Sequence, residues 1–287
     1  MRIATWNVNS LKVRLPQVLD WLAAHQPDVL CLQETKLQDD HFPLAAISEA
    51  GYHAIYAGQK TYNGVALLGR QPGTGVIAGM PGFDDPQKRV LSAVYGDVRI
   101  VCAYVPNGEH IESEKYQYKL RWLDAFHEWV AGLLDDCGRL ALLGDFNIAP
   151  EARDVYDPAA WEGQVLFSEP ERAAFGSMLG LGLQDGFRLF DQPEKSYTWW
   201  DYRMMAFRRN MGLRIDHILL SGDLAKLCTA CAIDKAARRL ERPSDHAPVL
   251  AELAMEPQGT CIALLPQRTG DSGDRIGRGD EPHGQGA

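Results

Sequence analysis

Short apolar runs and helix-like patterns alternate at the start of the chain. Residues 3–8 and 29–32 are apolar runs of strand length. Between them, apolar residues recur at the three- and four-residue spacing of one helical face, at Leu15, Val18, Leu19 and Leu22. The pattern predicts a strand, a helix that ends at Pro27-Asp28, and a second strand.

The middle of the chain predicts a meander followed by a long helix. Strand-like runs cover residues 65–68, 90–95 and 98–105. Gly96-Asp97, between the last two runs, is a strong signal for a hairpin turn. Helical spacing then predicts a helix over about 112–134 that ends before Gly138.

The second half of the chain continues the mixture of strands and helices. We expect a buried strand at 140–143, a polar loop with prolines at 149–170 and a helix around 171–179. Two late strands follow, at 213–220 and 247–253. Hairpins mixed with helices and fully apolar strands indicate layered α/β packing around stacked sheets.

Composition indicates the domain organisation. The chain has 287 residues, of which 46% are hydrophobic and 23% are charged, as in an average globular protein. Residues 257–287 contain seven glycines and three prolines, and such a segment buries too little apolar surface to offset its ordering entropy. We therefore expect one folded domain over residues 1–256 and a mostly disordered tail over 257–287.

Charge and hydropathy exclude some classes of protein. The 29 Lys and Arg against 38 Asp and Glu give a net charge of −9, which disfavours a protein that binds nucleic acid through a broadly basic surface. No run approaches the roughly 20 apolar residues that cross a bilayer, and no apolar signal core follows Met1. We therefore expect a cytoplasmic protein with no membrane association.

The cysteines fit that compartment. Cys31 and Cys102 lie in apolar strand-like runs, where a buried thiol behaves as a small hydrophobe. Cys228 and Cys231 form a CxxC pair, but neither a second pair at zinc spacing nor a thioredoxin-like context accompanies it. We interpret this pair as structural.

Polar side chains stand at the ends of several apolar strands. If those strand ends share one rim of the fold, the side chains converge on a rigid scaffold. Four carboxylates at close range cannot all stay ionised without a compensating cation, and oxygen ligands suit Mg²⁺ or Mn²⁺ rather than zinc. The pattern therefore predicts a divalent metal site. The residues in question are Asn7, Asn9, Glu34, Tyr104, Asp145, Asn147, Asp216, Asp245 and His246.

Taken singly, each of these residues has an ordinary structural explanation. Asn7 could cap a turn, Asp145 could form an Asx-turn and His246 could be a hydrogen-bonded core histidine. Jointly the balance reverses. Gly144-Asp145-Phe146-Asn147 and Ser244-Asp245-His246-Ala247-Pro248 pair an acid with an amide or an imidazole directly at predicted strand edges.

Six motifs, taken in order, resemble the exonuclease III family of abasic-site endonucleases. The resemblance runs from Met1 to about Leu253 and implies a four-layer α/β sandwich, two packed mixed β-sheets flanked by helices, of the DNase I-like type. It also implies Mg²⁺-dependent hydrolysis of the phosphodiester 5′ to an abasic site to leave a 3′-hydroxyl, with 3′–5′ exonuclease and 3′-end-cleaning activity. The motifs are Trp6-Asn7-Val8-Asn9-Ser10-Leu11, Leu32-Gln33-Glu34-Thr35-Lys36, Gly58-Gln59-Lys60, Gly144-Asp145-Phe146-Asn147, Gly212-Leu213-Arg214-Ile215-Asp216 and Ser244-Asp245-His246-Ala247-Pro248.

The same resemblance implies a metal-binding set. Glu34 is then the principal ligand, Asn7 lies in or next to the coordination shell, and Asp245 belongs to a second metal site. Mg²⁺ is the expected ion, with Mn²⁺ as a substitute. The full set that the resemblance implies is Asn7, Glu34, Asp145, Asn147, Asp245 and His246.

Catalytic roles follow from the resemblance as well. Asp145 aligns and activates the attacking water, and Asn147 donates a hydrogen bond to the phosphate or to Asp145. Asp216 fixes the tautomer of His246, which either accepts a proton from water or, when protonated, donates to a phosphate oxygen. Tyr104 either contacts the phosphate or assists the leaving group.

The implied partner is double-stranded DNA with abasic sites or blocked 3′ ends, bound by a monomer. Trp199 is expected to face a pocket for a flipped-out abasic sugar, since unstacking is least costly where no base pairs. One tryptophan of the pair Trp199-Trp200 is expected to belong to the core. A less specific DNase or phosphatase of the same superfamily and a catalytically idle damaged-DNA-binding module are the alternatives. The residues expected to contact DNA are Asn9, Lys60, Trp199, Trp200, Phe207, Leu213 and Arg214.

Overall fold

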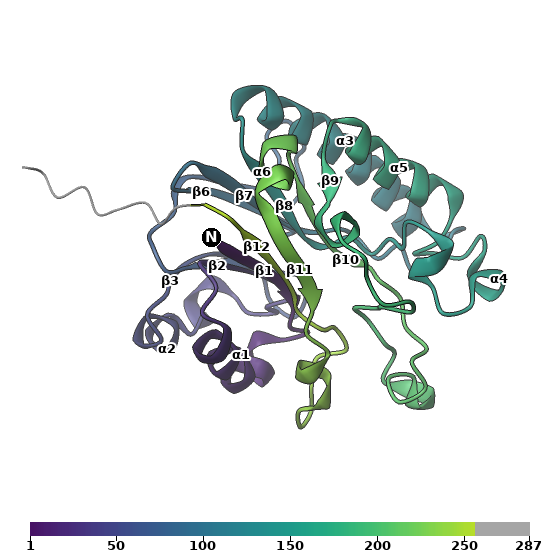
Figure 1. Cartoon of the computed structure of the whole chain (residues 1–287), viewed down its shortest axis with the longest axis horizontal. Coiled ribbons are helices and arrows are strands. Elements are labelled where there is room, and N and C mark those ends of the chain that lie inside the picture. Colours follow the sequence, from purple (N-terminus) through teal and green to yellow (C-terminus); the bar gives the residue numbers. More distant parts are fainter. Residues whose placement is uncertain (256–287) are drawn as a thin grey trace, which may run out of the picture. The chain divides into compact units, whose positions relative to one another are not determined.

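Two six-stranded β-sheets pack face to face, and helices cover both outer faces (Figure 1). The structure is a computed structural model that describes residues 1–255. The four-layer α/β sandwich predicted from the sequence is confirmed. The predicted tail at 257–287 lies outside the described residues. No helix among residues 1–255 is long and apolar enough to cross a membrane.

The first sheet has the strand order β11–β12–β1–β2–β4–β3. Strands β1 and β2 are parallel and the other neighbours are antiparallel, so the sheet is mixed. Helix α1 (Leu11–His25) buries Val18 and Leu22 against its outer face, and α2 (Leu44–Glu49) buries Ile47 there. The strands are β1 (Arg2–Asn7), β2 (Val29–Gln33), β3 (His53–Ala57), β4 (Val65–Gly69), β11 (Cys228–Ile233) and β12 (Val249–Leu253).

The second sheet has the order β5–β6–β7–β8–β10–β9, with β7 and β8 parallel. Helix α3 (Glu114–Asp136) packs Trp122 and Phe126 on its outer face, beside Phe175 of α5 (Glu169–Gly180). The strands are β5 (Thr74–Ala78), β6 (Val90–Tyr95), β7 (Val98–Tyr104), β8 (Leu140–Asp145), β9 (Gln184–Asp185) and β10 (Asp216–Leu220).

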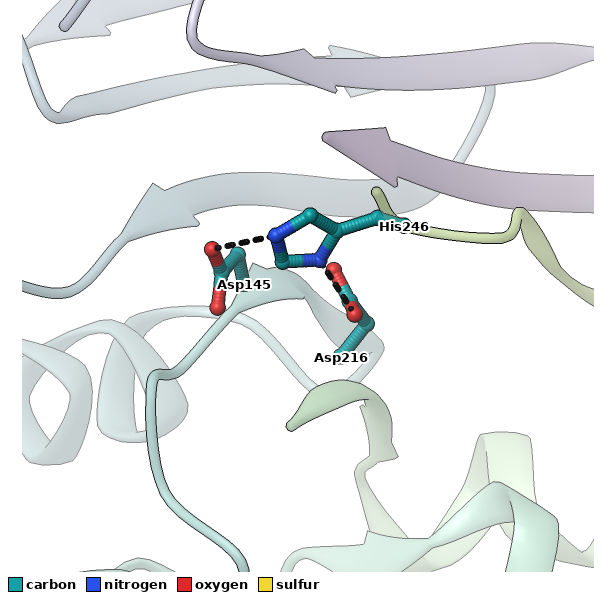
Figure 2. A group of neighbouring side chains, drawn as sticks. All are labelled: Asp145, Asp216 and His246. Atoms are coloured by element: carbon teal, nitrogen blue, oxygen red, sulfur yellow. Dashed lines mark hydrogen bonds and ion pairs between the residues drawn. The ribbon is translucent and has the colours of Figure 1, made fainter. Parts of the chain in front are cut away.

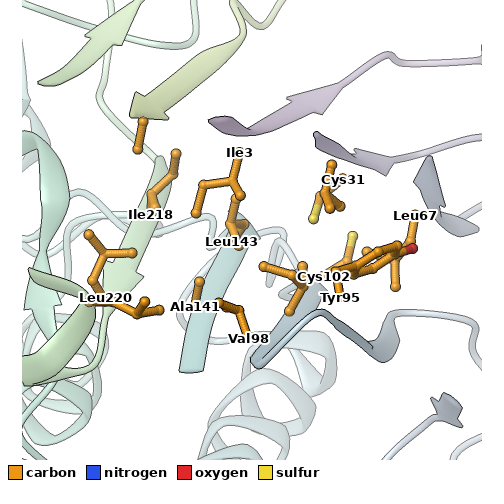
Figure 3. Close-up of a cluster of buried hydrophobic side chains, with 14 of the residues drawn as sticks. Ile3, Cys31, Leu67, Tyr95, Val98, Cys102, Ala141, Leu143, Ile218 and Leu220 are labelled. Atoms are coloured by element: carbon orange, nitrogen blue, oxygen red, sulfur yellow. The ribbon is translucent and has the colours of Figure 1, made fainter. Parts of the chain in front are cut away.

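The main core fills the space between the sheets (Figure 3). Because side chains alternate along a strand, Ile3 of β1 faces Leu143 of β8 in this core while Ala4 faces the helices. Cys31 and Cys102 are fully buried in the same core. Both thiols therefore act as the small apolar side chains that the sequence predicts.

Some elements escape the sequence pattern. Strand β11 carries the CxxC pair at the sheet edge, and its five exposed or half-buried positions remove the alternation that marks a strand. The loop predicted at 149–170 contains short helical segments, and the strand predicted from 213 starts only at Asp216, because Leu213 bridges to Val155 and Trp199 instead. The remaining helical segments are α4 (Pro158–Trp161), α6 (Gly222–Leu227), η1 (Asp39–His41), η2 (Ala152–Asp154), η3 (Gly186–Leu189), η4 (Arg203–Met205) and η5 (Lys235–Arg239).

Strand register brings polar residues to one rim of the sandwich. Asp145 is the register partner of Tyr104 on β7 and of Asp216 on β10. On the other sheet, Asn7 at the end of β1 lies opposite Gln33 at the end of β2. Side chains from both sheets therefore converge where these strands end.

Candidate active site

Three buried side chains form the centre of the rim (Figure 2). His246 lies between two carboxylates, with its Nδ1 at 2.8 Å from Asp216 Oδ2 and its Nε2 at 3.7 Å from Asp145 Oδ2. One ligand atom of each residue lies within 4.8 Å of the other two. We call Asp145, Asp216 and His246 the Asp-His trio.

The trio shares charge in a dry environment. Burial alone would lower the pKa of His246, but the two flanking aspartates outweigh it and raise that pKa to about 10. Burial raises the pKa of Asp145 to about 7, with Asp216 adding to the rise and His246 opposing it. The arrangement therefore favours an imidazolium at neutral pH, held by a carboxylate on each side.

Asn7 joins the two sheets at this point. Its Nδ2 donates to Glu34 Oε1 at 3.0 Å and to Asp145 Oδ2 at 2.9 Å. The Tyr104 hydroxyl donates to the same Glu34 oxygen at 2.8 Å. Burial, together with the Glu34 and Asp145 carboxylates, raises the pKa of Tyr104 well above its usual value, so its hydroxyl stays a donor.

Glu34 stays ionised although it is largely buried. Desolvation would raise the pKa of Glu34, but Lys36 and the hydrogen bond from Asn7 outweigh it and lower that pKa. Lys36 Nζ lies 2.8 Å from Glu34 Oε2 and donates to Asn9 Oδ1 at 2.6 Å. An ionised carboxylate in this position is suited to bind a divalent cation.

A tight turn after β8 presents Asp145 and Asn147. Gly144 is needed there because a Cβ at this position would lie 1.8 Å from the Ala103 carbonyl oxygen. Asn147 has a left-handed φ of 49°, and its backbone N–H donates to Asp145 Oδ1 at 2.9 Å. Asn147 Nδ2 donates to the Val105 carbonyl at 3.0 Å. The spacing Gly-Asp-x-Asn thus builds a carboxylate whose orientation is set by its own turn.

Lys119 is a supporting residue that the sequence reasoning missed. Its side chain is fully buried and Nζ donates to the backbone carbonyls of Asn107 at 3.1 Å and Asn147 at 2.7 Å. It also forms an ion pair with fully buried Glu171 of α5. A lysine on the apolar face of a predicted helix is the signal that could have marked it.

Asp245 lies beside the trio and is bound by two donors. Trp199 Nε1 donates to its Oδ2 at 3.0 Å and Asn9 Nδ2 donates to its Oδ1 at 2.9 Å. Burial would raise the pKa of Asp245, but the charge of His246 and these hydrogen bonds lower it. Both carboxylate oxygens are therefore engaged, and Asp245 holds Trp199 and Asn9 in place.

The expected DNA contacts divide into surface and interior residues. Lys60 is exposed, and Asn9, Trp199 and Phe207 are half-buried. Trp200 and Leu213 are fully buried, with Trp200 packed edge-on against Phe207 at 5.0 Å between ring centroids. The expectation that Trp200 and Leu213 contact DNA directly is therefore wrong for this structure, because both side chains are buried in the core.

The expectation that Arg214 contacts DNA is wrong for this structure as well. Its side chain is 1% exposed, and its Nε lies 2.7 Å from Asp154 Oδ1 while its Nη1 lies 2.7 Å from Asp185 Oδ2. The same guanidinium hydrogen-bonds to His217 Nδ1 at 3.0 Å. Two aspartates already neutralise this buried charge, so Arg214 is a structural residue and not a phosphate contact.

Two grooves reach the rim through residues that touch Glu34. One, of about 460 Å³, is lined by Lys12, Lys36 and Lys60. The other, of about 630 Å³, is lined by Tyr104 together with Arg89 and Lys115. Since Lys36 and Tyr104 both bind Glu34, each groove borders the Glu34 carboxylate.

The loop after Trp199 carries a feature that the sequence reasoning did not single out. Met204 and Met205 are 70% and 65% exposed, and both have left-handed φ values of 60° and 52°. Two exposed methionines in this strained conformation, in a loop with Arg203 and Arg208, are available for contact with a ligand. Such a pair is visible in the sequence, but its exposure is not.

The donor chemistry of the rim fits a divalent metal. Glu34, Asp145 and Asp216 offer carboxylate oxygens, while the Asn7 amide oxygen accepts from the Asn9 N–H and its Nδ2 faces Glu34 and Asp145. Asp216 Oδ1 is buried and has no hydrogen-bond partner within residues 1–255. Buried oxygen donors that outnumber the nearby cations match the preference of Mg²⁺ or Mn²⁺ rather than of a soft metal.

Comparison with known proteins agrees with this geometry. The model of the Endonuclease/Exonuclease/phosphatase family matches residues 4–246. Exodeoxyribonuclease III of Haemophilus influenzae is 35% identical over 265 residues, which cover 88% of this chain and 99% of that protein. Exodeoxyribonuclease of Bacillus subtilis is 33% identical over 255 residues, 87% of this chain and 98% of that protein.

Solved structures agree in fold and length. The 3′–5′ exonuclease NExo of Neisseria meningitidis is 48% identical with a TM-score of 0.87, and the match covers 89% of this chain and 100% of that one. An AP endonuclease from Archaeoglobus fulgidus is 38% identical with a TM-score of 0.86 over 89% and 100% of the two chains. The chain therefore belongs to the endonuclease/exonuclease/phosphatase family, as an enzyme of the exodeoxyribonuclease III type.

Proposed function

We propose that this protein is a Mg²⁺-dependent DNA repair nuclease that hydrolyses the phosphodiester 5′ to an abasic site and leaves a 3′-hydroxyl. The observation that carries the proposal is the Asp-His trio, joined by Asn7 to the Glu34 carboxylate on the opposite sheet. This arrangement supplies an oxygen-rich metal site beside a buried acid and base. Relatives named exodeoxyribonuclease III and AP endonuclease support DNA as the substrate.

Glu34, with Asn7 beside it, would hold the Mg²⁺ ion. When bound, the ion supplies positive charge that stabilises the phosphate and the leaving 3′-oxygen. Asp245 accepts hydrogen bonds from Trp199 and Asn9. We therefore prefer a role in supporting the substrate pocket over a role as ligand of a second metal. Asp145, Asn147 and His246 complete the proposed metal and phosphate environment.

The chain's own groups position the reacting atoms. Asp145 accepts a hydrogen bond from the attacking water and orients it. The backbone N–H of Asn147 donates to Asp145 Oδ1 at 2.9 Å and holds that carboxylate in place. The raised pKa of His246 supports the protonated form, which donates to a phosphate oxygen. Of the two roles that the sequence leaves open for His246, we therefore propose the donor role. Tyr104 stays protonated and is a donor toward the phosphate or the leaving group.

A second candidate function is removal of blocking groups and nucleotides from 3′ ends at the same site. The specific observation is the 48% identity to NExo of Neisseria, described as a 3′ phosphatase bound to product DNA hairpin. Both reactions cleave a phosphoester next to a 3′-oxygen, so one metal centre serves both. They differ in what the neighbouring loops admit.

Substrate selection is assigned to the rim around the trio. Trp199 and Phe207 are proposed to line the pocket for the abasic sugar, while Asn9 and Lys60 contact the DNA backbone. The lysines of the two grooves are proposed to give local binding on a body whose net charge is −9. We expect a monomer to bind double-stranded DNA with abasic sites or blocked 3′ ends in this way.

Three matched duplexes test the proposal. One carries an internal tetrahydrofuran abasic analogue, one a nick with a 3′-phosphate and one an undamaged recessed 3′ end, each assayed with Mg²⁺, with chelator, and with Asp145→Asn as the inactive control. We expect Mg²⁺-dependent incision at the abasic analogue. Hydrolysis of only the 3′-phosphate or 3′ end would select the second function, and no chelator-sensitive hydrolysis of any duplex would overturn both.

A further inference from the structure

We propose that Arg238 is a positioning residue that couples the substrate-facing loop to the catalytic histidine. We call residues 199–210 the recognition loop and residues 244–246 the histidine segment. Arg238 lies in η5 and touches both. The inference rests on the function proposed above, and it assigns a role to a buried cation that the reaction itself does not use.

On one side, Arg238 is held by aromatic rings of the recognition loop. Its guanidinium carbon lies 4.9 Å from the ring centroid of Phe207, 5.6 Å from that of Tyr202 and 5.9 Å from that of Trp200. The side chain is 6% exposed. A desolvated guanidinium among aromatic rings gains from each ring face, so it holds the three rings together.

On the other side, Arg238 holds the histidine segment. Its Nη1 donates to the Ser244 carbonyl at 2.6 Å. The Ser244 hydroxyl in turn donates to the Asn7 carbonyl at 2.6 Å and accepts from the His246 backbone N–H at 3.2 Å. Through Ser244, Arg238 is thus connected by two hydrogen bonds to the backbone of His246. Two hydrogen bonds through the same residue connect it to the backbone of Asn7, which bridges the sheets.

The burial of Arg238 costs free energy, which indicates that its position has a role. Its Nε is buried and has no hydrogen-bond partner in the described part of the chain. An unpaired buried donor on a charged group costs free energy that an apolar side chain of similar volume avoids. The fork geometry of arginine, which a hydrophobic residue lacks, is what links the rings to the Ser244 carbonyl.

The recognition loop and the histidine segment are also joined directly. The Trp200 N–H donates to the Asp245 carbonyl at 3.1 Å, and Trp199 Nε1 donates to the Asp245 carboxylate. A loop that releases its aromatic rings therefore also pulls on the residues beside His246. Arg238 contacts both segments as well, so we expect the recognition loop and His246 to change position together.

Arg238→Met tests the coupling, with Arg238→Lys as the conservative variant and Arg121→Met as the matched control on the exposed face of α3. On the abasic duplex, we expect Arg238→Met to lower kcat by about tenfold or more while KM changes by less than about threefold, because a displaced histidine acts on the chemical step. Arg238→Lys keeps the charge but not the fork and should give an intermediate kcat. Arg121→Met should match the wild type.

Limited trypsin digestion gives a readout that does not depend on activity. The recognition loop offers Arg203, Arg208 and Arg209 as cleavage sites, and we expect cleavage there to speed up by about fivefold in Arg238→Met, since local opening governs proteolysis. If Arg238→Met does not fold, Arg238→Lys carries both measurements.

The outcomes separate the coupling from the proposed function. A wild-type enzyme that leaves the abasic duplex uncut contradicts the proposed function, while the trypsin comparison still tests whether Arg238 anchors the loop. A kcat within twofold of wild type, a change confined to KM, or unchanged cleavage of the recognition loop would each overturn the coupling.

Discussion

Two groups of buried charge meet at Asn147 and are built in opposite ways. On one side, Lys119 donates to the Asn147 carbonyl and pairs with Glu171. On the other side, Asp145 of the Asp-His trio accepts from the Asn147 N–H at 2.9 Å. One turn of backbone thus separates a structural ion pair from the proposed catalytic centre.

The Lys119–Glu171 pair leaves no polar atom without a partner. Lys119 Nζ has three acceptors, one of them Glu171. Glu171 Oε1 also accepts from the Leu166 N–H at 3.0 Å, and Oε2 accepts from the N–H and hydroxyl of Ser168 at 3.0 and 2.6 Å. A buried network in which every member is satisfied is rigid.

The Asp-His trio lacks this balance. Two carboxylates share one imidazole, and Asp216 Oδ1 has no hydrogen-bond partner within the described residues. The pKa of Asp145 rises to about 7, which means that burial and Asp216 disfavour its ionised form. The satisfied ion pair therefore holds Asn147 in place, whereas the trio keeps a buried carboxylate oxygen that, within residues 1–255, is free to bind a ligand.

The largest expected effect breaks the trio itself. His246→Asn should lower kcat on the abasic duplex by about 10³-fold or more, because it removes the positioned donor and leaves both aspartates unpaired. The circular dichroism spectrum should stay that of the wild type. His53→Asn, on the exposed edge of β3, is the matched control. Turnover near the wild-type level would contradict the catalytic role of His246.

Breaking the structural pair should act on stability. Lys119→Met leaves Glu171 buried and uncompensated, and we expect it to lower the free energy of unfolding by about 3 to 5 kcal/mol, measured in urea. The Lys119→Met, Glu171→Met double variant should recover part of this loss, since no buried charge remains. A double variant less stable than both singles would show that the pair is held by something other than charge balance.

The stability of the folded protein should depend on pH through Asp145. Because the folded-state pKa of Asp145 is raised to about 7, the folded protein binds this proton more tightly than the unfolded chain. The contribution of the group to stability is therefore present near pH 4 and lost as the pH rises through about 7. In chelator, Asp145→Asn should be more stable than wild type at pH 8, with the gain vanishing toward pH 4.

Urea unfolding at the two pH values measures this effect. Glu171→Gln serves as the contrast, because it breaks a satisfied network and should destabilise at both pH values. Added Mg²⁺ at about 100 times its dissociation constant should stabilise the wild type by about 2.7 kcal/mol and Glu34→Gln by less. Equal stability of Asp145→Asn and wild type at pH 8 would show that the trio is not strained.

The smallest expected effect lies at the edge of the trio. Trp199→Ala should reduce the preference for the abasic duplex over an undamaged one by about tenfold, because it removes a pocket wall and a hydrogen bond to Asp245. Trp199→Phe keeps a ring without the donor and should retain most of the preference. The ratio of kcat/KM values on the two duplexes is the measurement, and an unchanged ratio in Trp199→Ala would reject the pocket.

Sequence reasoning recovers the parts of the fold that local patterns carry. Strands such as β2 and β8 are continuous apolar runs, and the polar residues that end them mark the rim. The edge strands β3, β5 and β11 are harder, because their exposed sides lack a clean alternation. The candidate site residues can be identified from the sequence, since strand-end carboxylates and amides are local features.

The residue types at the strand ends fix the chemistry available to this protein, namely four carboxylates, an imidazole and amides. The order of the motifs carries the family resemblance. Which charged residues meet at the rim and which pair in the interior depends on the tertiary packing. The sequence does not show that Arg214 and Lys119 pair with Asp185 and Glu171 in the interior, because those partners lie far along the chain. The same long-range packing joins Asn7 to Asp145 across 138 residues, a contact that local patterns do not encode because it depends on how two separate sheets face each other.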